Sequence, residues 1–302
     1  MLKVKLFTLL FIGVLGSNSA YCQKVTPSFF TPADTLNHKR HVFVLTSETT
    51  LLGTTLIGLN QIWYKKYPHA NFHFINDNSE WCQMDKVGHF YTTYQLTKVS
   101  ANALNWAGLS KKKQLLYGAS ISLAFMTTIE VFDGYSAEWG ASTGDLIANA
   151  SGTTLYVTQE LLWKEQRILP KFSFHTTSYA SQRPTLLGST LNEQLIKDYN
   201  GQTYWLSFNL HSFFKKSQIP VWANLAIGYG AEGMLYGNPD NWANSTQRYR
   251  QLYLSFDVDL NKIDTKSHFL KTLFAVLNTI KIPAPTLEVT PNSGFKFHGL
   301  YF

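Results

Sequence analysis

Long apolar stretches, interrupted by polar residues at helical spacing, fill the first half of the chain. Their pattern predicts helices at residues 42–64, 79–106, 114–132 and 142–163. Ser79 stands where it can cap the second of these helices, and Ser142-x-x-Asp145 has the spacing of a capping box at the start of the fourth. We therefore expect residues 41–165 to form a helical bundle domain.

After Pro170 the pattern changes to shorter aromatic runs with partial alternation of apolar and polar positions. These runs predict strands at residues 171–180, 203–210, 224–236, 248–260 and 295–302, with a short helix at residues 268–279. About five strands are too few to close an outer-membrane barrel, which needs about eight or more. The expected fold is therefore α+β: an N-terminal helical bundle followed by a smaller β-rich C-terminal segment, residues 170–302, with its sheet packed on the helices or on a membrane face.

The first 22 residues have the features of a secretory signal. Two lysines precede an apolar stretch at residues 6–15, and small residues follow up to Ala20. Cys22 lies at the depth of a lipoprotein cysteine, but Tyr21 precedes it where lipoprotein processing requires a small residue. We therefore expect a cleaved signal peptide without a lipid anchor, and export to the periplasm or outer membrane of a Gram-negative-type envelope.

Cys82 is the single cysteine that remains after such a cleavage. An intrachain disulfide is then excluded, even in an oxidising compartment. We interpret Cys82 as a thiol packed among apolar side chains rather than as a ligand.

The composition favours a protein close to a membrane. Aromatic residues make up 15% of the chain, and charged residues also make up 15%, against a usual share of about 25%. The basic residues are scattered, which argues against a nucleic-acid partner and is compatible with an anionic lipid surface. The expected partner is the envelope membrane or a membrane protein.

Polar residues recur on single faces of the apolar helices. Asp85 and His89 are four residues apart, as are Asp145 and Asn149, and each pair shares a helix face. Burying so many carboxylates separately would be costly, because an unpaired buried charge costs several kcal/mol or changes its protonation. We therefore expect one shared site, made of Asp85, His89, Glu130, Asp133, Asp145 and Asn149.

The chemistry of this site is open at the level of the sequence. Asp85 and His89 form either a catalytic couple with His89 as the base, or a structural pair that ties helices together. His89, Glu130 and Asp133 could hold a divalent metal, since oxygen ligands with one histidine suit a hard or borderline cation. The alternative for the two carboxylates is a helix-end pair held by backbone amides.

Lys86, Asn149 and Asp145 are the candidates for ligand binding. Lys86 can act as a counter-charge to the carboxylates, and Asn149 can hydrogen-bond across to them. Asp145 either joins this group or serves mainly in the cap of its own helix. Gly152, one turn after Asn149, would let another helix approach closely.

The ordered motifs carry a family resemblance. They are Asp85-Lys86-x-x-His89-Phe90, Glu130-x-x-Asp133-Gly134 and Gly140-x-Ser142-x-x-Asp145-x-x-x-Asn149-x-x-Gly152. The series, over about residues 81–163, resembles the YfiM-like family of predicted periplasmic lipoproteins, a domain of unknown function. Residues 197–205 also look like a family feature. The layout is similar to that of VanZ-like membrane proteins, whose multiple spans are missing here. The resemblance implies envelope placement and a shared site, and supplies no reaction.

The leading functional hypothesis is an envelope protein that binds an amphipathic or lipid-related ligand, or a cation, at the carboxylate and histidine site. One alternative is a hydrolase or transferase acting on envelope lipid or glycan. Another is a structural accessory of an outer-membrane assembly. No phosphate loop, dinucleotide fingerprint, nucleophile elbow or His-Glu-x-x-His motif is present.

Overall fold

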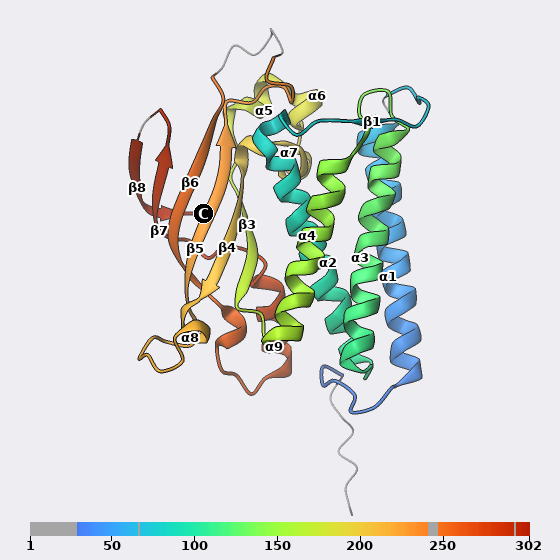
Figure 1. Cartoon of the computed structure of the whole chain (residues 1–302), viewed down its shortest axis with the longest axis vertical. Coiled ribbons are helices and arrows are strands. Elements are labelled where there is room, and N and C mark those ends of the chain that lie inside the picture. Colours follow the sequence, from blue (N-terminus) through green and yellow to red (C-terminus); the bar gives the residue numbers. More distant parts are fainter. Residues whose placement is uncertain (1–28, 66, 241–246, 293) are drawn as a thin grey trace, which may run out of the picture.

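A layer of long helices lies beside a six-stranded sheet (Figure 1). The computed structural model describes residues 29–65, 67–240, 247–292 and 294–302. The predicted signal at residues 1–22 lies outside the described residues. The α+β prediction is confirmed, because the long helices come first along the chain and the sheet follows.

Four helices make up the first layer. They are α1 (His38–Leu59), α2 (Met84–Trp106), α3 (Lys111–Gly134) and α4 (Thr143–Leu162). A π-helical turn, η1 (Asn60–Tyr64), continues α1. In Figure 1, α2 and α4 lie between the sheet and α3, and α1 is the outermost helix.

Glycines allow α2 to pack closely against both α3 and α4. A Cβ atom added at Gly152 on α4 would lie well inside van der Waals contact with the carbonyl oxygen of Phe90 on α2. A Cβ atom at Gly118 on α3 would lie 3.0 Å from the carbonyl oxygen of Thr97 on α2. The predicted close approach at Gly152 is confirmed, and it brings the polar faces of α2 and α4 together.

The sheet is antiparallel, and its strands follow one another in chain order. They are β3 (Ile168–Phe174), β4 (Gln202–Asn209), β5 (Ala223–Glu232), β6 (Tyr249–Val258), β7 (Ala284–Thr290) and β8 (Gly294–Tyr301). The prediction of a strand at residues 171–180 is wrong beyond Phe174, because the Thr177 side chain caps a short helix, α5 (Ser178–Gln182). Strand β7 was not predicted; Pro285 lies in it at a register shift, which tolerates a missing backbone N–H.

A tight turn, rather than a capping serine, starts α2. Trp81, Cys82 and Gln83 all have positive φ angles, in the 3₁₀ segment η2 (Glu80–Gln83). Ser79 makes no capping hydrogen bond, so the prediction of Ser79 as the cap of α2 is wrong. Cys82 packs with Met84, Ala231 and Met234, which confirms it as a buried apolar thiol.

Short elements complete the chain. They are β1 (Phe74–Ile75), β2 (Ala141–Ser142), α6 (Pro184–Leu187), α7 (Leu191–Lys197), η3 (Tyr199–Gly201), α8 (Leu210–Phe213), η4 (Leu260–Lys262) and α9 (His268–Leu277). Strands β1 and β2 pair in parallel, with Ile75 opposite Ser142. This pairing fixes the loop before α2 against the first residues of α4.

The sheet curls strongly around a small interior. Trp205 on β4 and Tyr301 on β8 have ring centroids 6.0 Å apart, although four strand spacings separate them, about 19 Å in a flat sheet. Phe172 on β3 also exchanges backbone hydrogen bonds with Thr279 and Lys281, just before β7. The convex face packs on α2, where Tyr91 contacts the rings of Phe172 and Tyr204.

The concave face of the sheet is polar and the convex face is apolar. On β6 the buried positions are Gln251, Tyr253, Ser255 and Asp257. The exposed positions on the same strand include Leu252, Leu254 and Phe256. Inside, the Lys171 ammonium lies 2.8 Å from the Asp257 carboxylate, and both side chains are completely buried. This polarity is the reverse of that expected for a sheet whose outer face contacts water.

Candidate functional site

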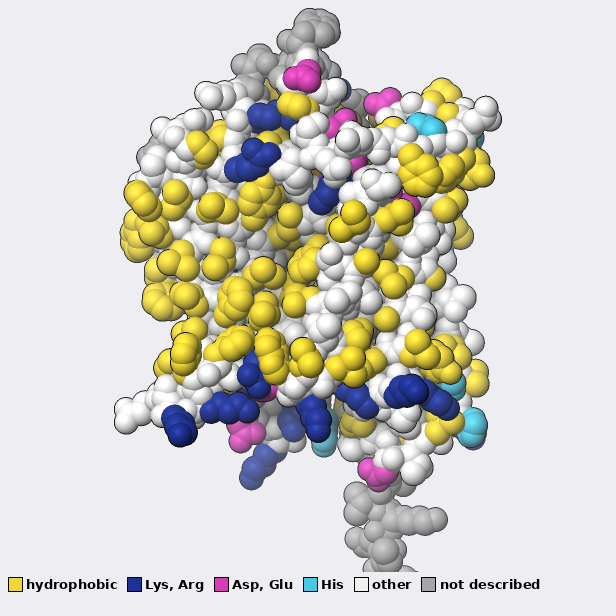
Figure 2. Space-filling model, viewed as in Figure 1, with side chains coloured by type: hydrophobic (Ala, Val, Ile, Leu, Met, Phe, Trp, Pro, Cys, Tyr) yellow, Lys and Arg dark blue, Asp and Glu magenta, His cyan; other side chains and the backbone are white. Residues whose placement is uncertain are grey.

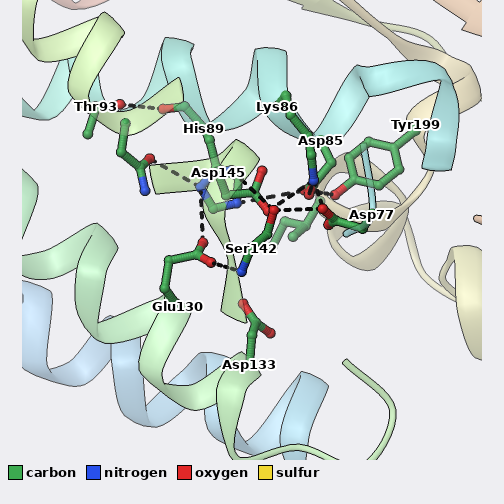
Figure 3. A network of polar contacts seen from close by, with 12 residues as sticks. Asp77, Asp85, Lys86, His89, Thr93, Glu130, Asp133, Ser142, Asp145 and Tyr199 are labelled. Carbon is green, nitrogen blue, oxygen red and sulfur yellow. Dashed lines mark hydrogen bonds and ion pairs between the residues drawn. The ribbon is translucent and has the colours of Figure 1, made fainter. Parts of the chain in front are cut away.

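Polar side chains from four segments meet at one end of the helix layer, where α2 and α4 begin and α3 ends (Figure 3). The segments are the loop before α2, the first turns of α2, the last turns of α3 and the first turns of α4. The site extends to η3, which precedes the second strand of the sheet.

The Lys86 ammonium lies among three carboxylates. Its Nζ atom is 2.5 Å from Asp77 Oδ2, 3.0 Å from Asp145 Oδ2 and 3.3 Å from Asp85 Oδ2. The Lys86 side chain is only 13% exposed, so water screens these ion pairs weakly. Lys86 therefore joins the loop before α2 to the start of α4, 59 residues further along the chain.

His89 lies one turn further along α2 and faces both α3 and α4. Its Nδ1 atom is 3.1 Å from Asn149 Oδ1 and 3.6 Å from Glu130 Oε1. Its Nε2 atom is 3.8 Å from Asp85 Oδ1. An amide oxygen accepts, so the Asn149 contact favours the tautomer with hydrogen on Nδ1 and leaves Nε2 as an acceptor or ligand atom on the Asp85 side.

The start of α4 is capped by two different side chains. Ser142 Oγ accepts a hydrogen bond from the Asp145 backbone N–H at 3.3 Å and donates one to Asp77 Oδ1 at 2.6 Å. The Ser142 backbone N–H donates to Glu130 Oε2 at 3.0 Å. The Ser142 cap agrees with the predicted spacing. In a capping box the side chain three residues after the cap accepts a hydrogen bond from the backbone N–H of the cap residue. Here Glu130 accepts that bond from Ser142 instead, because the Asp145 carboxylate is turned toward Lys86.

Three polar atoms in this site are buried without a hydrogen-bond partner among the described residues. They are Glu130 Oε1, Asp145 Oδ1 and Asn149 Nδ2. Their residues are 3%, 4% and 1% exposed, respectively. Buried polar groups are normally satisfied, so these three atoms leave hydrogen-bonding capacity unused within one cluster of the described residues.

Asp133 lies apart from this cluster. Its Oδ1 atom accepts a hydrogen bond from the Tyr64 hydroxyl on η1 at 2.9 Å. Figure 3 shows Asp133 beyond Glu130, without a contact to the other residues drawn. The structure thus brings together Asp85, Lys86, His89, Glu130, Asp145 and Asn149, and gives Asp133 a different partner.

Two members of the site were not predicted from the sequence. Asp77 comes from a loop without periodicity, and only the β1–β2 pairing brings it to Ser142 and Lys86. Tyr199 donates a hydrogen bond from its hydroxyl to Asp85 Oδ1 at 2.6 Å. Tyr199 lies in the stretch 197–205 that resembles a family feature, and that resemblance was the available signal for it.

Acidic side chains outnumber basic side chains around the site. Asp77, Asp85, Asp145 and Glu130 face one lysine and one histidine. Nearby on η2, burial and the charge of Asp77 raise the pKa of Glu80 above its usual range, against the opposing effect of Lys86. A cation would offset this surplus.

One subset has the geometry of a metal site. One ligand atom each from Asp85, His89 and Asp145 can be chosen so that all three lie within 4.8 Å of one another. Two ligand atoms on opposite sides of one ion, each about 2.4 Å from it, are about 4.8 Å apart. Lys86 engages Asp85 Oδ2 and Asp145 Oδ2, and the Tyr199 hydroxyl donates to Asp85 Oδ1. Asp145 Oδ1 is therefore the carboxylate oxygen of this pair that has no hydrogen-bond partner among the described residues.

These features define a class: a helix-and-sheet protein with a buried acidic site at the helix ends. Residues 73–160 match the family model described as "Predicted periplasmic lipoprotein (DUF2279)", which confirms the family resemblance of the ordered motifs. Residues 197–205 lie outside the match, so their resemblance stays a prediction. The matched residues include the site residues of α2, α3 and α4. The description agrees with the predicted location, and the protein is one of the periplasm or outer membrane. The similarity to the VanZ-like layout stays a prediction.

No curated protein and no solved structure matches the chain.

Proposed function

We propose that this envelope protein binds a divalent cation through Asp85, His89 and Asp145. The main support is the convergence of three ligand atoms within 4.8 Å beside a buried carboxylate oxygen of Asp145 that lacks a hydrogen-bond partner in the described chain. Two carboxylates and one imidazole suit borderline or hard cations such as Zn²⁺, Mn²⁺ or Ca²⁺. Glu130 and Asn149 contact His89 and orient it as neighbours of metal ligands do.

Metal analysis of the purified full chain tests this proposal directly. We expect a divalent ion to copurify or to bind on titration, and Asp145→Asn and His89→Gln to weaken binding at least tenfold. Asp133→Asn is the matched control, because Asp133 is an acidic residue of the same region that bonds to Tyr64 instead. Absence of binding in the wild type, or equal loss in Asp133→Asn, would contradict the proposal.

An open groove favours an amphipathic ligand as the wider partner of this site. The groove, of about 500 Å³, runs along α4 beside Phe90 of α2 and is lined mainly by apolar or small side chains. Phe90, next to His89, and Ala150, next to Asn149, are among its lining residues. A lipid-like molecule could place its chain in this groove with its polar head toward the site. Recovery of lipid by mass spectrometry from the wild type, and its loss from Ala150→Trp, would support this.

A hydrolase or transferase is the second candidate. Asp85 contacts His89 at 3.8 Å and accepts a hydrogen bond from Tyr199, an arrangement that can orient a histidine base. A cation at the same place would lower the pKa of a bound water and supply a nucleophile. Turnover of an envelope ester or phosphoester that disappears in His89→Gln, with the fold retained, would favour this candidate over binding alone.

A further inference from the structure

A broad band of apolar side chains, called the belt below, crosses the middle of the face of the molecule that Figure 2 shows. We define the belt by the exposed apolar side chains of α1, α3, α4 and the convex face of the sheet. Its members include Val42, Phe43, Leu51, Ile57, Leu116, Leu161, Ile227, Leu252, Leu254, Phe256, Phe295, Phe297 and Leu300. An apolar surface on this scale is unusual for a protein that is surrounded by water.

We propose that this belt lies in the hydrocarbon region of a lipid bilayer, so that the protein is embedded in a membrane of the envelope. The sheet provides the first argument. Its side chains alternate between a polar interior and an apolar exterior, the pattern of strands that face lipid. Strands β5 and β6 have 10 residues each, within the roughly 9–11 residues that a tilted strand needs to cross a bilayer.

The helices provide the second argument. The continuous helix His38–Tyr64 has 27 residues, and α3 has 24 residues. At about 1.5 Å per residue both exceed the hydrocarbon thickness of about 30 Å. Only 6% of the apolar window of His38–Tyr64 is buried within the protein, so this helix is not the core helix of a soluble fold. Lipid chains are a chemical match for the exposed apolar surface of this helix.

Charges are placed as a bilayer requires. Both carboxylate oxygens of Glu48, the one acidic residue in α1, are buried rather than turned outward. Figure 2 shows lysine and arginine side chains gathered below the belt. Lys215, Lys262 and Arg167 lie around Glu165, just after the end of α4. Lys111, the first of three lysines at the start of α3, pairs with Glu160 on the last turn of α4. Such a basic rim fits anionic lipid headgroups.

The polar site lies at the opposite end of α3 from this basic rim. The embedded protein would therefore hold the site near one membrane surface, with the open groove along α4 on its side. A lipid could then reach the groove from within the membrane.

Spin labels on the full chain test the embedding. The protein is reconstituted into vesicles of phosphatidylethanolamine and phosphatidylglycerol, in a background with Cys22→Ala and Cys82→Ala. Nitroxides are attached through Leu254→Cys, Phe297→Cys and Leu116→Cys in the belt. The control label is attached through Lys216→Cys, an exposed residue next to Lys215 of the basic rim. We expect oxygen to relax the belt labels severalfold more than a water-soluble nickel chelate does, and the reverse at the control.

Two outcomes would overturn the proposal. Belt labels that collide with the nickel chelate as freely as the control would show that water covers the belt. Dipolar broadening among belt labels, in protein that is released from the vesicles by alkaline carbonate, would show that a second copy covers it. Three labels on separate elements keep the test decisive if one variant fails to fold.

Discussion

At the residue scale, Lys86 is the centre of the polar site. It joins Asp77, Asp85 and Asp145, which come from a loop and two helices. Helical spacing predicted the Asp85–His89 and Asp145–Asn149 faces, because positions four apart share a side of any helix. The partners of Lys86 depend on how these segments pack, and no local pattern specifies that.

Replacing Lys86 with Met should destabilise the protein by about 3 kcal/mol, because three carboxylates would lose their counter-charge in a poorly solvated place. Divalent cations should raise the melting temperature of Lys86→Met more than that of the wild type. Lys111→Met is the control, since Lys111 is 54% exposed and its ion pair with Glu160 should contribute less than about 1 kcal/mol. Equal losses in the two variants would contradict this role of Lys86.

Removing the Ser142 hydroxyl should cost about 1–2 kcal/mol, because α4 loses its cap and Asp77 loses a hydrogen-bond donor. Ser151→Ala on the same helix should change stability by less than about 0.5 kcal/mol, since its exposed hydroxyl donates to the carbonyl of Ile147 within its own helix. Denaturant unfolding in one detergent compares the two. A neutral Ser142→Ala would show that the cap adds nothing to stability.

Cation affinity of the site should fall as the pH is lowered. Protons compete with the ion for the imidazole of His89 and for the two carboxylates, and bound metal requires the deprotonated ligands. Titration calorimetry at several pH values measures the decline. Affinity that is constant between about pH 5 and 8 would place the ion on groups other than a histidine.

At the element scale, close helix contact determines whether the site forms. Gly152 is where α4 touches the backbone of α2, one turn from Asn149. A side chain there would push apart the two helices that carry Asp145 and His89. Glycines on α1 have no such neighbour, since a Cβ at Gly53 would meet nothing within 4 Å.

Gly152→Ala and Gly53→Ala should therefore act in opposite directions. The first should destabilise by roughly 1–3 kcal/mol through overpacking. The second should stabilise by up to about 1 kcal/mol, because alanine favours a helix over glycine. Thermal unfolding of both variants under the same conditions checks this. Tolerance of alanine at Gly152 would mean that α2 and α4 are further apart than the structure has them.

At the scale of the whole molecule, the apolar convex face of the sheet and the exposed apolar side chains of α1 form parts of the same belt. A triple variant with Leu252, Leu254 and Phe256 replaced by Ser should lower the fraction bound to vesicles in a flotation assay. Its Asp257–Lys171 ion pair inside the sheet should be retained, because the substituted side chains lie on the other face. Unchanged flotation would show that these strands do not contact lipid.

The sequence by itself determined the order of helices and strands, the two polar helix faces and the cap at Ser142. These depend on periodicity and on neighbours a few residues apart, which the backbone geometry of a helix or strand fixes. Most helix and strand positions could be predicted from this periodicity. Strand β7 and the turn before α2 could not, because a register shift interrupts the first and residues with positive φ angles form the second.

Only the tertiary structure decided which polar residues share the site. It brought Asp77 and Tyr199 to Asp85 and Lys86, and it placed Asp133 on Tyr64. It also decided that the sheet curls with its polar face inside. Contacts between residues more than fifty positions apart depend on how helices and strands pack. That packing is chosen by the burial of whole faces, which no short stretch of sequence specifies.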